Sequence, residues 1–228
     1  MKKAAIALGL TLLAHASLAA DSGGGLRQFL AARAAHDAEV ARTIWEYAEV
    51  GYQETKSSAL LQQELKGAGF SVEAGVAGIP TAFVATAGSG KPVIGILAEF
   101  DALPGINQDA VPERKPIEGK QAGHACGHHL FGTASVSAGI ALADWLQKSG
   151  KKGTIRVYGT PAEEGGSGKV YMVRAGLFND VDAVMHWHAS DVNFAGIDKA
   201  LANKSAKFRF HGLSAHASGA PEKGRSAL

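Results

Sequence analysis

The sequence has 228 residues with 23 basic and 21 acidic side chains, so its charge is close to balanced. Without Lys2 and Lys3, which precede an apolar run, basic and acidic residues number 21 each. No basic stripe with interleaved aromatic residues remains, which argues against nucleic acid as a partner. With only one cysteine, Cys126, the chain has no internal disulfide, which leaves an intermolecular bond, an inert thiol or a metal ligand.

Residues 1–20 are predicted to be a signal peptide that is not part of the fold. Two lysines precede the apolar run, and small residues close the segment at 17–20. The run is short for a bilayer, which takes roughly 20 apolar residues, so a retained membrane anchor is the weaker alternative. The mature protein is therefore expected to be periplasmic or secreted, with no membrane contact after cleavage.

The spacing of apolar residues after the leader predicts alternating helices and strands. The expected elements are helices at 26–49 and 55–66, strands at 70–74, 81–87 and 92–100, a polar loop at 101–125, a helix at 130–147, a strand at 154–160, a helix at 167–176 and a strand at 182–188. This order is typical of an α/β sheet with ligand chemistry at the strand ends. Alternation over 205–212 predicts a one-sided strand in a new layer, so a domain boundary is placed near 195–203.

Reactive side chains are concentrated at or just past the predicted strand ends. They are Glu99, Asp101, His124, Cys126, His128, His129, Glu163, Glu164, His186 and His188. Borderline-soft divalent metals prefer the imidazole, thiolate and carboxylate groups that these residues supply. Cys126 and His128 are two apart, so one backbone turn can direct both at a single ion. The glycine between them is expected to remove a side chain where the backbone comes close.

Each of these patterns also has a simpler interpretation. Cys126 could be an inert core thiol, and Glu163 and Glu164 a solvated acidic pair. Against this, adjacent carboxylates repel each other, and a bound cation would relieve that repulsion. Neighbouring side chains diverge, so one carboxylate could bind a metal while the other moves protons in amide hydrolysis. His186 and His188 would share one face of a strand, and the spacing does not choose between them.

A family resemblance follows from the order of these segments. The run 45–54 and then EFDALPG, HACGHH, GTPAEEGG, DAVMHWHAS and GLSAHASGAPEKGRSAL resemble the co-catalytic metal amidohydrolases, which include aminoacylase-like, hippurate-hydrolase-like and auxin-conjugate hydrolases. The resemblance implies a three-layer α/β metallopeptidase-type catalytic domain at 21–200, with helices on both faces of a mixed sheet. It also implies the start of an inserted α/β lid, or dimerisation, domain at 201–228, and a last histidine ligand beyond the residues present.

The resemblance also implies the chemistry of the site. The expected metal ligands are Cys126, His128, Glu164 and His188, and the expected cofactors are two divalent ions, zinc or manganese. Glu163 is expected to act as general base and then general acid. The expected substrate is a small N-acyl or N-aroyl amino acid, such as p-aminobenzoyl-glutamate, or a peptide. The alternatives are a dipeptidase or carboxypeptidase with the same site, and a metal-binding product without activity.

Further residues receive more limited predictions from the same resemblance. Asp101 is expected to orient a ligand. His216 is expected to polarise the substrate carbonyl across a dimer, although the spacing alone favours an ordinary surface histidine at this position. Glu99 stands where other branches place a metal-binding histidine, and His129 where relatives have Asn or Asp; with His186, they are possible pocket residues. The lid implies a homodimer or hetero-oligomer.

Overall fold

The computed structural model describes residues 22–196, 202 and 204–227. Their contacts define two compact units, divided between Ala189 and Ser190, and each is described by itself. The expected signal peptide at 1–20 lies outside the described residues, as does most of the boundary expected near 195–203. Within the described ranges, no helix combines the length and the apolar character needed to cross a bilayer.

The first unit alternates helices with strands. Its helices are α2 (Ser22–Tyr47), α3 (Thr55–Gly67), η1 (Val76–Gly78, a 3-10 turn), α4 (His128–Ser149), α5 (Glu163–Gly166) and α6 (Gly168–Arg174). Its strands are β1 (Ser71–Ala74), β2 (Phe83–Ser89), β3 (Val93–Ala98), β4 (Leu103–Pro104), β5 (Ala122–Gly123), β6 (Gly153–Gly159) and β7 (Ala183–Met185). Each helix and strand predicted between 26 and 188 is present with shifted ends, and the loop predicted at 101–125 contains the short pair β4 and β5.

The main sheet is mixed, with five strands in the order β1-β2-β6-β3-β7. β1, β2 and β6 pair antiparallel, whereas β6, β3 and β7 run parallel. The register sets Ala98 beside Gly159 and Ile96 beside Met185. The segments that follow β3, β6 and β7 therefore leave the same edge of the sheet, which is where α/β proteins build ligand sites.

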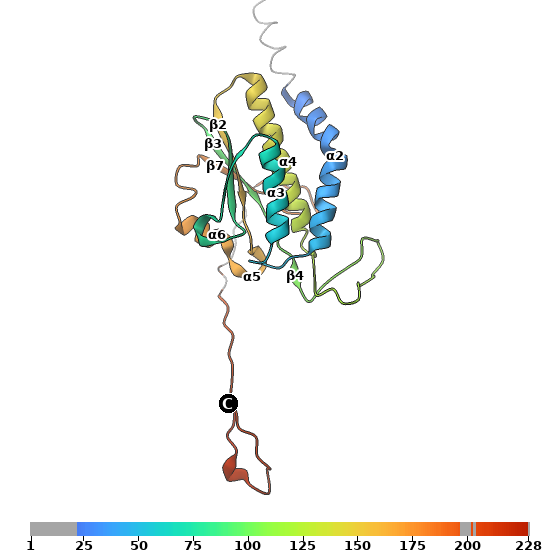
Figure 1. The fold of residues 1–228 in the computed structure, drawn as a ribbon, viewed down its shortest axis with the longest axis vertical. Helices are drawn as coiled ribbons and strands as arrows, with labels where there is room; N and C mark the ends of the chain where they lie inside the picture. The colour runs from blue at the N-terminus through green and yellow to red at the C-terminus, as the bar shows by residue number, and fades with distance from the viewer. Residues whose placement is uncertain (1–21, 197–201, 203, 228) are drawn as a thin grey trace, which may run out of the picture. The chain divides into compact units, whose positions relative to one another are not determined.

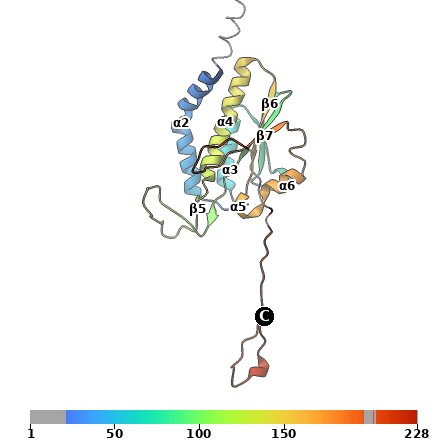
Figure 2. The same cartoon turned by 180° about the vertical axis from the view of Figure 1, so that it is seen from behind.

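Helices cover both faces of this sheet, which confirms the three-layer α/β fold. α2, α3 and α4 lie on one face and α6 lies on the other (Figures 1 and 2). The core on the first face is the larger and includes Ile44, Phe83 and Val157, whereas Tyr158 and Met172 belong to the second. α4 lies very close to the sheet at Gly132, where an added Cβ would be 2.5 Å from the Glu99 carbonyl oxygen.

The second unit has little regular structure in its described residues. It contains the 3-10 turn η2 (Pro221–Lys223) and an isolated bridge between Leu213 and Arg225. The strand predicted at 205–212 is wrong, because within the described part of the unit these residues form no ladder with a neighbour. Alternating side chains alone do not make a strand, since its backbone groups need a second strand as hydrogen-bond partner.

Candidate metal centre

Three donor groups from two segments of the chain meet at the carboxyl edge of the sheet. Cys126, His128 and Glu164 each offer one ligand atom, and these atoms all lie within 4.8 Å of one another. His128 and Cys126 lie at the start of α4, and Glu164 lies in the single turn after β6. We call these three residues the metal cluster. A thiol, an imidazole and a carboxylate are the ligand types that zinc and similar divalent ions accept.

Two buried atoms of the cluster form no regular hydrogen bond in the described structure: Oε1 of Glu164, and Nε2 of His128, which has Glu99 Oε2 at 3.1 Å. They lie 4.0 Å apart. Buried polar atoms are nearly always paired, so these two neighbouring acceptor atoms favour a bound cation. His188 adds a further donor, since its Nε2 is 3.3 Å from Cys126 Sγ. The residues present therefore fit a divalent metal ion.

Gly127 sets the directions of Cys126 and His128. Its φ of 106° lies in the left-handed region, which favours glycine. An added Cβ would come no closer than 4.0 Å to the Phe131 ring. The prediction that this glycine serves a close approach is therefore wrong, because the backbone turn before α4, and not crowding, requires it.

Asp101 holds two members of the cluster with one buried carboxylate. Its Oδ1 accepts a hydrogen bond from His128 Nδ1–H at 2.8 Å, and its Oδ2 accepts one from the Glu164 backbone N–H at 3.0 Å. With Nδ1 protonated and bonded, Nε2 of His128 keeps its lone pair for a metal ion on the side of Glu164. The structure thus gives Asp101 the contacts that an orienting residue needs.

Glu99 brings a second buried carboxylate to the same imidazole. Its Oε2 is 3.1 Å from His128 Nε2, and its Oε1 contacts Lys169 Nζ and lies 3.2 Å from His186 Nε2. Burial alone would raise the pKa of Glu99, but His128, His186 and Lys169 lower it far below its usual range. Sequence reasoning missed Lys169, because one lysine in an amphipathic segment is typical of a solvated helix face.

The pKa values show an excess of negative charge around the cluster. Burial alone would lower the pKa of His128, but the carboxylates of Asp101 and Glu99 raise it to about 10. Burial and the nearby Glu164 raise the pKa of the Cys126 thiol to about 11. Both shifts favour a bound positive charge, and a metal cation takes that place when it displaces protons from its ligands.

Glu163 and Glu164 diverge, as their adjacency predicts. The side chain of Glu164 is 20% exposed and belongs to the cluster, whereas that of Glu163 is 44% exposed, with its Oε2 3.8 Å from His128 Nε2. The preceding residue, Ala162, has φ 56° and ψ 44°. This left-handed conformation costs a residue with a Cβ about 1–2 kcal/mol. Neighbouring contacts must therefore hold the turn in place.

The two histidines after β7 do not share a strand face, contrary to the prediction. The strand ends at Met185, so His186 and His188 lie in irregular chain beyond it. His186 contacts Glu99, whereas His188 contacts Cys126, which separates the two. Ile96 and Met185 form the last pair between β3 and β7, so the two histidines lie beyond the paired part of the strand.

Comparisons with known proteins agree with this geometry. Residues 95–204 match the family model described as Peptidase family M20/M25/M40. This chain belongs to that family. It is also 47% identical over 193 residues to one of the subunits of p-aminobenzoyl-glutamate hydrolase from Escherichia coli strain K12, covering 83% of this chain and 40% of that protein. The chain therefore spans about 40% of the length of this curated relative.

Two solved structures share the fold of this M20-family chain. A dinuclear metal-binding M20 peptidase from Bacillus subtilis has a TM-score of 0.58 and 26% identity, over 68% of this chain and 43% of that one. An aminobenzoyl-glutamate utilization protein from Klebsiella pneumoniae has a TM-score of 0.58 and 20% identity, over 90% of this chain and 57% of that one. The second likeness concerns the fold alone.

His129 and His216 of this M20-family chain make other contacts within their own units. The His129 ring packs on Trp45 at 4.9 Å between centroids and on His124 at 5.1 Å. Burial and the charge of His128 lower the pKa of His129 to about 4. His216 belongs to the second unit, where its Nδ1 accepts a hydrogen bond from Gly219 N–H at 2.9 Å. The role predicted for His216 therefore stays a prediction.

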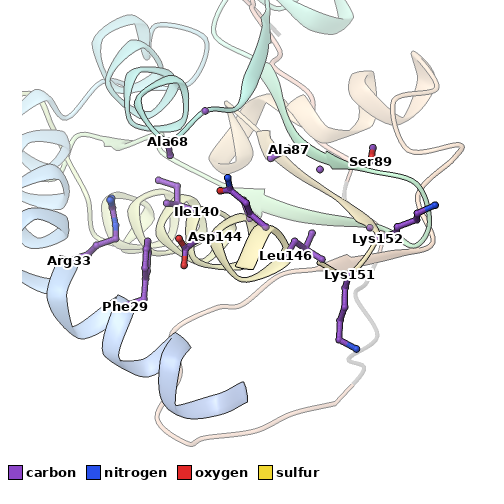
Figure 3. Close-up of a pocket in the computed structure, with 15 residues that line it drawn as sticks. Phe29, Arg33, Ala68, Ala87, Ser89, Ile140, Asp144, Leu146, Lys151 and Lys152 are labelled. Carbon is purple, nitrogen blue, oxygen red and sulfur yellow. The ribbon is translucent and has the colours of Figure 1, made fainter. Parts of the chain in front are cut away.

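A hollow in the first unit lies away from this site. It has a volume of about 710 Å³ and is lined by Phe29, Arg33, Ile140 and Lys152 among others (Figure 3). Ser89 at the end of β2 and Gly153 at the start of β6 also line it. Since Glu163 follows the other end of β6, the hollow and the metal cluster lie at opposite ends of that strand.

Proposed function

We propose that this chain carries the metal site of a hydrolase that cleaves the amide bond of N-acyl or N-aroyl amino acids, with p-aminobenzoyl-glutamate as the leading substrate. One observation carries the proposal: Cys126, His128 and Glu164 bring three unlike donor atoms within 4.8 Å of one another, beside the separate carboxylate of Glu163. The substrate class is supported by the 47% identity to the p-aminobenzoyl-glutamate hydrolase chain from Escherichia coli.

Cys126, His128, Glu164 and His188 would hold the metal, and the dinuclear peptidase of similar fold supports two divalent ions. Zinc or manganese is proposed because both accept this set of ligands. A divalent ion bound there acts as a Lewis acid that polarises the amide carbonyl and lowers the pKa of water. Glu163 accepts the proton of the attacking water and returns it to the leaving amine nitrogen.

The other residues of the site support this proton transfer. Asp101 keeps the His128 ring in the orientation and tautomer that leave Nε2 free. His216 would donate a hydrogen bond to the oxyanion that develops on the substrate carbonyl, reaching it from the lid of a second copy of the chain. Assembly into a homodimer or hetero-oligomer belongs to this proposal, and it is supported because the relative from Escherichia coli is itself one subunit of a hydrolase. Export to the periplasm also stays a proposal, supported by the leader-like residues 1–20.

The proposal is tested by incubating the purified chain with p-aminobenzoyl-glutamate and Zn²⁺ or Mn²⁺ and measuring released p-aminobenzoate by chromatography. Glu163→Gln should lower the rate by about 10²- to 10⁴-fold, the usual contribution of a general base, and should still bind the metal. The matched control is Glu46→Gln, because the Glu46 side chain is 59% exposed and pairs only with Arg42 in the described structure.

Two outcomes would contradict the proposal. Equal rates for the wild type and Glu163→Gln would exclude Glu163 as the base. Cleavage of dipeptides without cleavage of the aroyl amide would favour the alternative of a dipeptidase with the same site.

A further inference from the structure

Glu54 is a buried carboxylate that the proposed reaction does not use. Its exposed fraction is 0%. Its Oε1 accepts a hydrogen bond from the Ala162 backbone N–H at 2.9 Å, and its Oε2 accepts one from Thr81 Oγ1–H at 3.0 Å. The first bond joins residues 108 positions apart in the sequence. A buried charge is costly unless it is well bonded, so its position needs an explanation.

Capping of a helix does not explain Glu54. The residue stands directly before α3, where an acidic side chain usually accepts hydrogen bonds from the free N–H groups of the first turn. Glu54 makes no such bond with its side chain. Glu49 does so instead, since its Oε2 accepts hydrogen bonds from the backbone N–H of Ser57 at 2.8 Å and of Lys56 at 3.1 Å. The Glu54 carboxylate is therefore available to accept the hydrogen bond from the Ala162 backbone N–H.

Ala162 is the residue whose backbone directs the two carboxylates of the site. It is 1% exposed, has the left-handed conformation described above, and immediately precedes Glu163 and Glu164. Its N–H is held by Glu54, and its carbonyl oxygen accepts a hydrogen bond from Gly166 N–H at 3.0 Å. A residue with a Cβ keeps such a conformation only when its surroundings determine it.

The residues just before Glu54 pack on the same turn. An added Cβ at Gly51 would lie 2.9 Å from the Cβ of Ala162, so the two backbones are in close contact. The hydroxyl of Tyr52 donates a hydrogen bond to the Gly166 carbonyl oxygen at 2.5 Å. Segment 51–54 therefore contacts the turn at 162–166 at its start and at its end.

We propose that Glu54 is a positioning residue: by binding the Ala162 N–H, it fixes the turn that directs Glu164 into the metal cluster and Glu163 beside it. The proposal rests on the proposed function for its effect on catalysis. Its effect on metal binding can be measured without any substrate.

The experiment compares the wild-type chain with Glu54→Ala, Glu54→Gln and Glu49→Ala. Zn²⁺ affinity is measured by competition with a chromophoric chelator, and Co²⁺ is used to record the visible absorption bands that report ligand geometry. Glu54→Ala should weaken Zn²⁺ binding by about 10- to 100-fold, as is usual for loss of a residue that orients a ligand, and should alter the Co²⁺ bands. With substrate, kcat should fall more than KM rises.

Glu54→Gln should restore most of the affinity, because its amide oxygen can accept from Ala162 while its NH₂ group donates to Thr81. Glu49→Ala removes hydrogen bonds from the same end of α3 without touching Ala162, so it should lower thermal stability and leave Zn²⁺ affinity unchanged. Equal losses of affinity in Glu49→Ala and Glu54→Ala would overturn the proposal. So would wild-type affinity, Co²⁺ bands and kcat in Glu54→Ala.

If Glu54→Ala does not fold, Glu54→Asp takes its place, because it keeps the charge on a side chain one methylene too short for Ala162. Wild-type Zn²⁺ affinity in Glu54→Asp would overturn the proposal, and weakened affinity would support it. If no protein hydrolyses the amide but Glu54→Ala still weakens Zn²⁺ binding, the proposed function fails and the positioning role of Glu54 stands.

Discussion

Replacement of Asp101 by asparagine should weaken metal binding without changing the shape of the side chain. Both atoms that Asp101 bonds with its side chain are donors, namely His128 Nδ1–H and the Glu164 N–H, at 2.8 and 3.0 Å. A carboxylate offers two acceptor oxygens, whereas an amide offers one acceptor and one donor. In Asp101→Asn one buried N–H must therefore face an NH₂ group. An unpaired buried donor costs about 1–3 kcal/mol, or roughly 5- to 150-fold in affinity.

A chelator competition titration with Zn²⁺ measures this loss directly, and circular dichroism shows whether Asp101→Asn is folded. The matched control is Asp109→Asn in the loop between β4 and β5, where Asp109 pairs with Lys115 at 2.9 Å. Asp109→Asn should bind Zn²⁺ as the wild type does. An Asp101→Asn protein that binds Zn²⁺ within twofold of the wild type would refute the claim that Asp101 orients the cluster.

Three further predictions concern stability. Zn²⁺ at about 100 times its Kd should stabilise the wild type by ~2.7 kcal/mol and Cys126→Ser by less, and equal melting shifts in scanning fluorimetry would argue against the thiol as a ligand. Lys169→Met should lower the free energy of unfolding in urea by about 1–3 kcal/mol, because buried Glu99 loses its lysine and keeps only His128 and His186. A second change, Glu99→Gln, should recover much of that loss, and no recovery would refute the pairing. Burial and the neighbouring His129 lower the pKa of His124 from 6.5 to about 4, so the unfolded chain takes up the proton first and stability falls as pH drops between these values. His124→Gln should flatten that decline in the urea midpoint, and an unchanged slope would contradict it.

Much of the first unit could be predicted because its elements are set by local apolar periodicity. The apolar run at 92–100 predicted β3, which is covered on both faces, and the apolar spacing over 130–147 predicted α4. The second unit could not be predicted in this way. Residues 205–212 alternate like a strand, yet in the described unit Phe208 and Phe210 are 78% and 61% exposed. A strand depends on a distant partner that a local pattern does not reveal.

The metal cluster could be predicted because its donors follow strand ends and are of unusual types. The residues that hold the donors in place could not. Glu54 and Lys169 act through contacts that span 108 and 70 positions, and each has an ordinary local interpretation, as a helix cap and a solvated lysine. The left-handed conformation of Ala162 has no signal in its sequence, because glycine and asparagine favour this conformation and alanine does not.

The charge around His128 explains why a carboxylate at position 99 is compatible with a metal site. Four carboxylates have oxygens within 4.0 Å of this ring, those of Glu99, Asp101, Glu163 and Glu164. Lys169 offsets one of them through Glu99, whereas His128 is neutral when it binds a metal and offsets none. The negative charge that remains favours a bound divalent cation. Without Lys169, Glu99 would add to that excess, so the lysine allows Glu99 to lie beside the imidazole and leaves Cys126, His128 and Glu164 as ligands.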